Sequence, residues 1–303
     1  MPELPEVEVV RSGLAPAMTG ARILSVAVHD ERALTRHAGG AADFVARLEG
    51  SEVASVARRG KFLWMPLARA SSGGDRSAIV GHLGMSGQLL LRRPDASAER
   101  HERIRLFVEH PQHGELAVVF ADQRTFGSLA VDALVPTPDA RAAGWGSMEP
   151  FLPSQVAHIA RDPMDEAFQD RAFRAALRTR SSAIKRVLLD QNLISGVGNI
   201  YADESLWAAR IHPETPASAL STVAVNRLLA EVRAVLEKAL AEGGTSFDAQ
   251  YVNVNGQVGY FAHSLNAYGR TGRPCARCGT PIRRDAFMNR SSHFCPRCQR
   301  IRR

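Results

Sequence analysis

The spacing of apolar residues changes along the chain and predicts two kinds of structure. Over residues 3–20 these residues recur at helical spacing, so we expect an N-terminal helix that Gly20 ends. From Ile23 to Val131, short β-branched runs alternate with polar or small residues, and turn-forming clusters separate the runs. This pattern is typical of an antiparallel β-sandwich or barrel, with one interior helix near 44–48.

A Pro-rich interval separates this part from a helical one. Residues 135–153 contain four prolines and no sustained periodicity, which indicates a linker. Beyond the linker the apolar residues recur with a period of 3.6. The helices expected there span 166–178, 181–193, 199–209 and 221–241.

The charge balance favours a polyanionic partner. Lys and Arg total 38 against 31 Asp and Glu, which gives a net charge of +7 and a sequence pI near 9.7. Such a surface binds nucleic acid through counterion release, although a merely basic soluble protein stays an alternative. No apolar stretch approaches the ~18 residues of a membrane span, and MPELPEVEVV lacks a basic targeting region. We therefore expect a soluble, cytoplasmic protein without membrane contact.

All four cysteines lie near the C-terminal end, with metal-ligand spacing. They form the pattern C-x2-C-x16-C-x2-C with Cys275, Cys278, Cys295 and Cys298. Two such pairs can surround one tetrahedral Zn²⁺ with four thiolates, which leaves no open position for a reacting water. The sequence thus predicts one structural zinc ion, with two disulfides as the alternative. Basic residues crowd this ribbon, and Arg290 stands at its tip, where contact with phosphate is expected.

A glycine-containing segment joins two of the expected helices. It reads LDQNLISGVGNIYADESLW over 189–207, with Asn199 as the expected N-cap of the second helix. Glycines let a phosphate approach the backbone, and a helix start attracts anions. Spacing alone supports phosphate binding and an ordinary helix connection equally.

The N-terminus offers an unusual nucleophile. Pro2 is small enough for Met1 to be removed, which leaves a secondary amine beside Glu3 and, one helical turn on, Glu6. An α-amino group has a reference pKa near ~8, against ~10.4 for Lys, so more of it is neutral and nucleophilic at physiological pH. A frayed chain end is the alternative explanation of this dipeptide.

Six motifs occur in a fixed order along the chain, and together they indicate a family resemblance. PELPEVE, RRGK, GHLGMSG, DQRTFG and GVGNIYADE precede the cysteine ribbon, at 2–8, 58–61, 81–87, 122–127 and 196–204. Together they resemble the formamidopyrimidine-DNA glycosylase family over nearly the whole chain. The resemblance implies an α+β multidomain fold: an N-terminal antiparallel β-sandwich with a catalytic helix, a helix-two-turn-helix domain and a C-terminal zinc finger. The corresponding limits are 2–134, linker 135–153, 154–243, a lesion-covering loop at 244–262, and 263–303.

The resemblance also implies a role for each matching residue. Pro2 is expected as the Schiff-base nucleophile at the sugar C1′, Glu3 as the acid that assists ring opening, and Glu6 as a supporting carboxylate. Catalysis near the attacked sugar also involves Lys61 and Arg290, which bind phosphate. The expected DNA contacts come from His82, Asn199 and Arg290 on the backbone and from Met85, Arg124 and Phe126 as the wedge beside a flipped nucleotide.

The implied activity is bifunctional base excision repair. A monomer would bind double-stranded DNA with oxidised bases or abasic sites, excise oxidised purines through the Schiff base, and cleave the strand by β,δ-elimination. One alternative is an endonuclease VIII-like enzyme for oxidised pyrimidines, against which stand Leu4, where that branch typically has Gly, and the HLGMSG motif. A catalytically silent DNA-binding zinc protein is the other, against which stand Pro2, Glu3 and Lys61.

One motif departs from the family. The wedge often reads DPRRFG, whereas Gln123 and Thr125 occupy the variable positions here. The residues expected to act, Arg124 and Phe126, remain. Residues 245–261 correspond to the region that covers the flipped base, and their individual contacts cannot be assigned from the motif.

Overall fold

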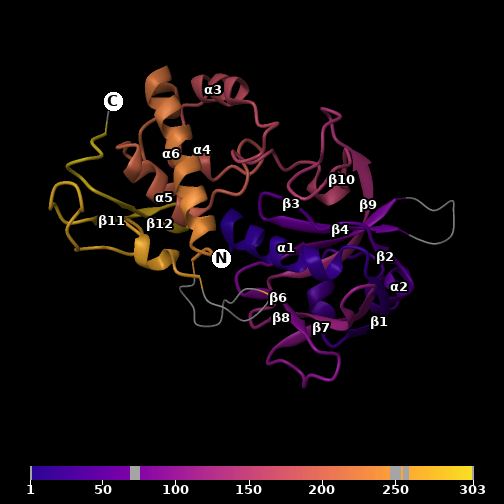
Figure 1. The fold of residues 1–303 in the computed structure, drawn as a ribbon. Helices are drawn as coiled ribbons and strands as arrows, with labels where there is room; N and C mark the ends of the chain where they lie inside the picture. The colour runs from indigo at the N-terminus through magenta and orange to yellow at the C-terminus, as the bar shows by residue number, and fades with distance from the viewer. Residues whose placement is uncertain (1, 69–75, 246–253, 255–258, 302–303) are drawn as a thin grey trace. The chain divides into compact units, whose positions relative to one another are not determined.

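The computed structural model describes residues 2–68, 76–245, 254 and 259–301, and it divides the chain into two compact units (Figure 1). Unit 1 is Met1–His158 with Ser246–Gly259, and unit 2 is Ile159–Thr245 with Tyr260–Arg303. The expected linker 135–153 contains strands that pair within unit 1, so in the structure it is part of that unit.

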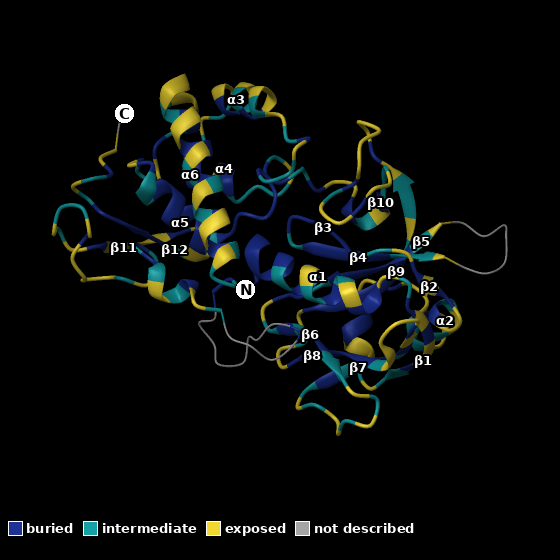
Figure 2. Cartoon of the chain, in the orientation of Figure 1, coloured by how far each residue is buried: buried dark blue, intermediate teal, exposed yellow. Residues whose placement is uncertain are grey.

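Unit 1 begins with helix α1, Leu4–Met18. Glu3 is its N-cap, and a capping box links the cap to Glu6: the Glu3 backbone N–H donates to Glu6 Oε2 at 2.8 Å, and the Glu3 side chain accepts from the Glu6 backbone. The helix buries an apolar face against strands β3 (Ala57–Arg59), β4 (Phe62–Ala68) and β7 (Glu102–His110) (Figure 2). Gly20 has φ +84°, a conformation that favours glycine, and the chain turns there into the first strand.

Ten strands of unit 1 form one hydrogen-bonded sheet among the described residues, nine of them along a single path. Their order is β10-β9-β5-β4-β2-β1-β7-β8-β6, with β3 on β4. A short 3-10 helix, η1 (Glu31–Leu34), and helix α2 (Gly40–Leu48) follow the first strand, and η2 (Ser154–Val156) follows the last. The strands are β1 (Arg22–Val28), β2 (Glu52–Val53), β3 (Ala57–Arg59), β4 (Phe62–Ala68), β5 (Ser77–His82), β6 (Gly87–Arg92), β7 (Glu102–His110), β8 (Gly114–Asp122), β9 (Ser128–Pro136) and β10 (Phe151–Pro153).

The sheet folds into two layers that share one core. The halves are joined at β1 and β2 by a single register pair, Arg22 with Glu52. Leu63 and Ile79 from one half and Phe120 from the other belong to the same buried cluster. Each large apolar side chain in it contributes about 1.5–3 kcal/mol through removal from water. The antiparallel sandwich expected from the alternating pattern is thereby confirmed.

Unit 2 is helical and ends in a two-stranded ribbon. The longest helix, α6, has a serine N-cap, and Ser221 Oγ accepts from the Ala224 N–H at 3.3 Å. Figure 2 shows α6 with a buried face and an exposed one. No helix in the described parts of the chain is long and apolar enough to span a membrane. The elements are α3 (Asp170–Arg178), α4 (Ile184–Leu188), α5 (Asn199–Ala208), η3 (Ala217–Ala219), α6 (Thr222–Ala241), η4 (Phe261–Ser264), β11 (Arg283–Phe287) and β12 (Arg290–Phe294).

Two helices are shorter than their apolar periodicity predicts. The expected helix over 181–193 is only α4, because Asp190 Oδ1 accepts from the Asn192 N–H at 3.1 Å and stabilises a turn instead. Likewise, α3 begins at Asp170 and not near 166, since Asp165 Oδ1 accepts from the Ala167 N–H at 2.8 Å. Aspartate side chains compete in this way with helical hydrogen bonds.

Candidate active site and DNA-binding surface

The first turn of α1 places the expected nucleophile beside two acids. Pro2 is buried, and so are Glu3 and Glu6, each with 2% of its surface exposed. The capping box fixes the backbone on which Glu3 is carried directly after Pro2. A helix start also carries partial positive charge, which favours carboxylates at these positions. The structure thus brings the three predicted residues together at one end of α1.

A buried ion pair fastens α1 to the hairpin that carries Lys61. Glu8 Oε2 accepts from Arg58 Nε at 2.8 Å, and Arg58 is only 1% exposed. Arg58 Nη1 also donates to the Gly60 carbonyl at 3.1 Å. Gly60 has φ +56° in the turn before half-buried Lys61. The RRGK motif therefore connects the helix to the lysine through Arg58, for which the sequence predicted no role.

His82 lies beside Lys61 at the adjoining end of the next strand. Phe62 pairs with His82 across β4 and β5, and the two rings are 4.7 Å apart. Burial, together with the positive charges of Arg36 and Lys61, lowers the pKa of His82 to about 4. The Gly84 N–H donates to His82 Nδ1 at 3.2 Å, so the neutral ring carries its proton on Nε2. His82 thus presents an uncharged donor next to a lysine.

The three predicted wedge residues meet on two neighbouring loops. Arg124 Nη1 lies 3.8 Å from Met85 Sδ. Met85 is 45% exposed and Phe126 is 63% exposed, which is unusual for large apolar side chains. Because they project beside an exposed arginine, they form a surface suited to entering a base stack.

Asp122, which is almost fully buried, ties these loops together. Its Oδ1 accepts from Ser86 Oγ at 2.6 Å and from the Arg124 N–H at 3.1 Å, and its Oδ2 accepts from the Gly127 N–H at 2.7 Å. Gly84 has φ +61°, and a Cβ there would lie 2.4 Å from the Gly127 nitrogen. The loops therefore approach each other closely enough to require glycine.

Most of the loop expected to cover the lesion, 244–262, lies outside the described residues. One of its described residues, Val254, is buried within unit 1, where its carbonyl accepts from the Leu91 N–H at 3.0 Å. A Cβ on Gly13 of α1 would lie 2.5 Å from Val254 Cγ2. The small residue in α1 thus makes room for Val254.

In unit 2 the glycine segment before α5 is held by Gln191. Its Oε1 accepts from the Gly196 N–H at 2.9 Å, and its Nε2 donates to the Val197 carbonyl at 2.9 Å. The expectation that Asn199 is the N-cap is wrong: Gly198 is the cap, and Asn199 is the first helical residue. Its Nδ2 donates to the ribbon, and its Oδ1 accepts no hydrogen bond from the described residues.

Asn199 and Arg290 are brought together through the start of β12. Asn199 Nδ2 donates to the Ser291 carbonyl at 3.2 Å, and Ser291 follows Arg290 directly. Arg290 pairs with Phe287 across a tight turn in which Met288 has φ +52°, and its side chain is exposed. The two residues expected to contact the DNA backbone in this unit therefore share one hydrogen-bonded segment.

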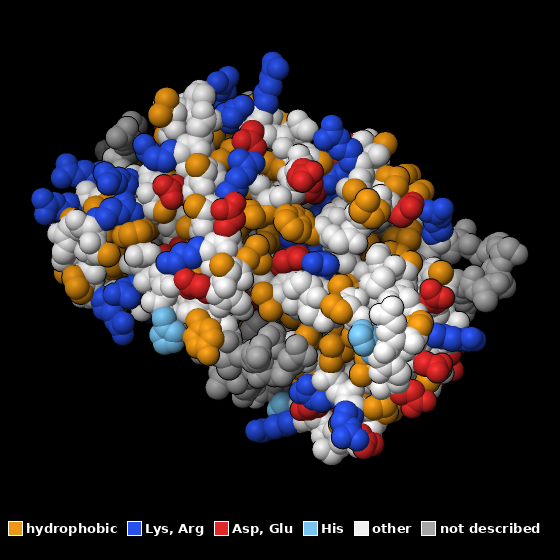
Figure 3. Space-filling view, in the orientation of Figure 1, with side chains coloured by type: hydrophobic (Ala, Val, Ile, Leu, Met, Phe, Trp, Pro, Cys, Tyr) orange, Lys and Arg blue, Asp and Glu red, His pale blue; other side chains and the backbone are white. Residues whose placement is uncertain are grey.

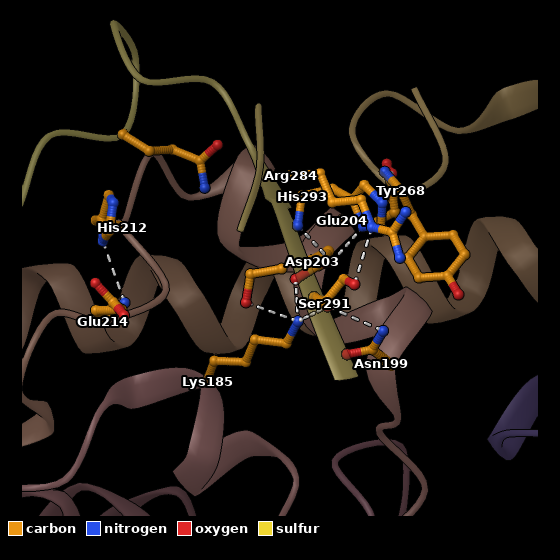
Figure 4. Close-up of polar contacts among 12 residues, drawn as sticks. Lys185, Asn199, Asp203, Glu204, His212, Glu214, Tyr268, Arg284, Ser291 and His293 are labelled. Atoms are coloured by element: carbon orange, nitrogen blue, oxygen red, sulfur yellow. Dashed lines mark hydrogen bonds and ion pairs between the residues drawn. The ribbon is translucent and has the colours of Figure 1, made fainter. Parts of the chain in front are cut away.

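A buried charged network holds the ribbon on α5 (Figure 4). Lys185 Nζ lies 2.7 Å from Asp203 Oδ1, with 0% and 1% of the side chains exposed. Lys185 also donates to the Ser291 carbonyl at 2.8 Å and to Ser292 Oγ at 3.0 Å. Asp203 Oδ2 accepts from the His293 backbone N–H at 2.9 Å and lies 3.1 Å from its Nδ1. The network spans α4, α5 and β12.

The four predicted cysteines form one cluster. Their Sγ atoms lie within 4.8 Å of one another, and Cys278 Sγ is 3.5 Å from both Cys295 Sγ and Cys298 Sγ. Zn–S bonds of about 2.3 Å place tetrahedral thiolates about 3.8 Å apart, so this set fits Zn²⁺. Burial and the neighbouring thiols raise the pKa of Cys298 to about 12, whereas hydrogen bonding with Thr280 lowers the pKa of Cys278 to about 6. A central cation would favour the thiolate form of all four sulfurs.

Trp207 of α5 contacts this cluster directly. Its Nε1 donates to Cys275 Sγ at 3.4 Å, and the Arg277 guanidinium lies 3.7 Å above its ring. Arg277 also donates to the Trp207 carbonyl. The metal site is therefore attached to the helix as well as to its own ribbon.

Basic side chains surround this part of unit 2. Figure 3 shows Lys and Arg side chains gathered over the end of the unit that carries β11. The exposed arginines of the ribbon and its C-terminal turn are Arg283, Arg284, Arg290, Arg297 and Arg300. Such a surface suits phosphate more than a base edge.

Family profiles match all three parts of the chain. The Formamidopyrimidine-DNA glycosylase N-terminal domain matches residues 1–129, the Formamidopyrimidine-DNA glycosylase H2TH domain matches 159–250, and the zinc finger found in FPG and IleRS matches 272–301. The Formamidopyrimidine-DNA glycosylase of Leifsonia xyli subsp. xyli is 65% identical over 301 residues, which cover 99% of this chain and 100% of that protein. The chain belongs to the formamidopyrimidine-DNA glycosylase family.

Solved structures of the family agree over the full length. A Lactococcus lactis FPG variant in complex with Fapy-dG containing DNA has a TM-score of 0.80 and 31% identity, and covers 99% of this chain and 100% of its own. Wild-type Lactococcus lactis FPG with an oxidised pyrimidine containing DNA has a TM-score of 0.79 and 30% identity, and covers 99% of this chain and 100% of its own.

Family membership confirms the expected multidomain α+β fold, the helix-two-turn-helix domain and the structural zinc finger. The chain is a DNA glycosylase of base-excision repair. Abasic-site lyase activity through a Schiff base is typical of this glycosylase family.

The residues that hold the glycosylase site in place were not predicted from the sequence. Glu8, Arg58 and Asp122 in unit 1 were not singled out, and neither were Lys185 and Asp203 in unit 2. Their signal was weak, because each partner lies on another element. Asp122 alone had a local signal that could have identified it, because its position at the start of DQRTFG, before a turn, is typical of a residue that organises a loop.

Proposed function

We propose that this glycosylase excises oxidised purines, 8-oxoguanine and formamidopyrimidines, with the amine of Pro2 as nucleophile, and then cleaves the strand by β,δ-elimination. The observation that carries the proposal is the arrangement of Pro2, Glu3 and Glu6 at the buried start of α1. The capping box fixes an acid beside the amine that Met1 removal exposes, which is the pairing that covalent catalysis at a sugar needs.

The proposed chemistry uses one intermediate for both reactions. The Pro2 nitrogen attacks C1′, the damaged base leaves, and a proton from Glu3 to the ring oxygen opens the sugar. The resulting iminium makes a C2′ proton acidic, and its removal expels the 3′ phosphate. Elimination of the 5′ phosphate follows. Glu6 supports the cap from which Glu3 acts, through its bond to the Glu3 N–H.

Phosphate contacts hold the damaged strand for this attack. Lys61 supplies a positive charge, and the neutral His82 beside it supplies an Nε2–H donor. In the other unit, Arg290 supplies a second positive charge, and Asn199 has one amide N–H beyond that given to Ser291. These four side chains bind the backbone and carry no information about the base.

The wedge is assigned to base flipping. Met85 and Phe126 would fill the gap left by the extruded nucleotide, and Arg124 would hydrogen-bond the orphaned partner base. Their exposure and their common support by Asp122 fit this role. A wedge of this kind requires double-stranded DNA, which is the substrate that we propose for a monomeric enzyme.

Borohydride trapping tests the nucleophile. Mature protein beginning at Pro2 should form a covalent adduct with a duplex that contains 8-oxoguanine, whereas a chain with Met1 retained should form none. Pro2→Gly should trap more slowly, because a primary amine remains. Glu3→Gln should bind DNA normally but suppress excision of an intact damaged nucleotide, with less effect at a preformed abasic site.

The alternatives give different results in the same assay. A chain that traps with Met1 retained at the wild-type rate has its nucleophile elsewhere, with Lys61 the first residue to test. A protein that binds the duplex but never traps is a silent DNA-binding protein. Faster excision of thymine glycol than of 8-oxoguanine would favour the endonuclease VIII-like alternative. Both substrates should be tested, because wild-type Lactococcus lactis FPG has been solved in complex with DNA that contains an oxidised pyrimidine.

A further inference from the structure

Unit 2 contains a cavity that shares only Arg290 with the proposed lesion site. Its volume is about 510 Å³, within the ~300–1,000 Å³ typical of ligand pockets. One wall comes from α4 and the residues around it, and the other from the tip of the β11–β12 ribbon. The lining includes Arg180, Arg186, Val187, Asp190, Phe287 and Arg290.

The charges around this cavity leave two guanidinium groups for a ligand. Arg180 Nη1 donates to Asp190 Oδ2 at 2.8 Å, and Asp190 Oδ1 accepts a backbone N–H, so these opposite charges are engaged with each other. The side chains of Arg186 and Arg290 are exposed and make no hydrogen bond or ion pair with the described residues. Two arginines facing one cavity are suited to an anion, and their planar groups match phosphate.

The apolar part of the cavity lining favours an anion that carries an organic group. Val187 and Phe287 are buried apolar residues that border the same cavity. A small hydrated ion gains nothing from such a surface, whereas a sugar attached to a phosphate can pack on it. The position of Arg290, to which the lesion phosphate is assigned above, places the cavity next to a DNA backbone.

We propose that this cavity is an additional DNA site, in which Arg186 binds a backbone phosphate that neighbours the one bound by Arg290. The proposal rests on the proposed function, since it takes Arg290 as a DNA contact. It makes Arg186 a determinant of how firmly the flanking duplex is held, separate from the residues that act on the sugar.

A protein-DNA double-mutant cycle tests the contact. The probe is a duplex that extends about ten base pairs to either side of a stable abasic analogue, with single phosphates replaced one at a time by neutral methylphosphonates. By fluorescence anisotropy, Arg186→Ala should weaken binding about three- to tenfold at low salt and lower the salt slope by about one. At one flanking position the methylphosphonate should weaken the wild type by a similar factor and leave Arg186→Ala unchanged.

Two variants serve as controls. Arg186→Lys keeps a positive charge and should restore the salt slope. Arg171→Ala removes an exposed arginine on α3 that does not line the cavity, and it should retain the methylphosphonate response of the wild type. Because Arg186 is exposed, its replacement should leave the melting temperature unchanged.

Three results would overturn the proposal. Arg186→Ala could bind the duplex with the affinity and salt slope of the wild type. Alternatively, every methylphosphonate could weaken Arg186→Ala and the wild type by the same factor. Inorganic pyrophosphate could bind the wild type and not Arg186→Ala, without coupling to any DNA phosphate, which would make the cavity a site for free anions. Borohydride trapping by Arg186→Ala at saturating enzyme separates these results from a failure of the proposed chemistry, since trapping should persist.

Discussion

The two units position DNA-binding side chains by different physical means. In unit 1, Met85, Arg124 and Phe126 stand on loops anchored in a β-sandwich with one extensive apolar core. In the ribbon of unit 2 the buried cluster consists largely of the zinc ligands, and Arg290 depends on that cluster and on the buried Lys185–Asp203 pair. A large core can support exposed loops by packing, whereas a short ribbon needs metal and charge.

Because the supports differ, their loss should have a different effect in each unit. Damage to the supports of unit 1 should alter lesion recognition while the sandwich remains folded. Damage to the supports of unit 2 should remove the ribbon itself, and with it affinity for any DNA. The expected effects range from loss of the zinc ion to the titration of one histidine.

Zinc removal should have the largest effect. Structural zinc contributes about 10–16 kcal/mol of apparent folding free energy in small zinc domains, and the ribbon has little other core. Chelation, or Cys275→Ser, should therefore abolish DNA binding while the strands of unit 1 keep their protection from hydrogen exchange. Metal analysis, anisotropy and exchange mass spectrometry measure the three quantities. Zinc-free protein that binds DNA as tightly as the wild type would contradict the assigned dependence of Arg290 on the metal.

Breaking the buried pair in unit 2 should come next. Lys185→Met leaves Asp203 charged and without its lysine in a buried position, which costs about 3–5 kcal/mol. The melting temperature of unit 2 and DNA affinity should both fall, while zinc content remains at one ion per chain. Lys238→Met, at an exposed lysine of α6, is the control and should change the free energy of unfolding by less than about 1 kcal/mol. Equal losses in the two variants would show that the buried network contributes nothing special.

Asp122→Asn tests the loop support in unit 1. The amide keeps the shape but replaces one acceptor by a donor, so a hydrogen bond from Gly127 or Ser86 is lost at a cost of about 1–3 kcal/mol. Excision of 8-oxoguanine should slow more than cleavage at an abasic site, because an intact base is harder to extrude. Asp95→Asn, in an exposed loop, provides the control. Equal slowing on both substrates would mean that Asp122 does not act through the wedge.

The fold was largely predictable because local pattern and final structure agree over most of the chain. The helix expected over 3–20 is α1, and the alternating runs are the strands of the sandwich. The predicted and observed helices differ where a side chain accepts a hydrogen bond from a nearby backbone N–H, as Asp190 does beyond α4. Apolar periodicity cannot detect that competition. The exact domain limits remain predictions.

The candidate site also contains residues that could be predicted from the sequence and residues that could not. Motifs identified the side chains that project from the surface, such as Phe126, but not the buried ones that hold them. Arg58 lies 50 residues from Glu8, and Ser291 lies 106 residues from Lys185, so neither contact leaves a local pattern. Helix α5 also starts one residue earlier than an N-cap at Asn199 predicts, because Gly198 has the extended cap conformation and Asn199 is already helical. The contact of Asn199 is distant as well, since β12 accepts its amide hydrogen.

Arg290→Ala and Phe126→Ala compare the two units on one substrate. Loss of a phosphate contact should weaken binding to damaged and undamaged duplexes alike and lower the salt slope by about one. Loss of the wedge should leave the slope nearly unchanged and reduce lesion discrimination by about 1–3 kcal/mol, the usual range for stacking on a base. Anisotropy at several salt concentrations gives both values. Equal slope changes in the two variants would remove this division of roles.

The smallest effect at neutral pH should come from His82, whose ionisation connects burial with DNA binding. Burial lowers its pKa from 6.5 to about 4, with Arg36 and Lys61 adding to the shift. Between these values the unfolded chain binds a proton that the folded chain does not, so the free energy of unfolding should fall as pH falls through this window. At pH 5 the loss is about 2 kcal/mol, and above pH 7 there is none.

His82→Gln keeps a donor and removes this titration. Its stability should therefore change less than that of the wild type between pH 7 and pH 5, measured by denaturant unfolding at fixed zinc. In the wild type, the His82 ring signal in an NMR titration should move near pH 4. Because the ring is neutral at pH 7, the variant should also bind DNA with an unchanged salt slope, unlike Arg290→Ala. A midpoint near 6.5 would mean that His82 is solvated, and its contact with phosphate would then carry charge.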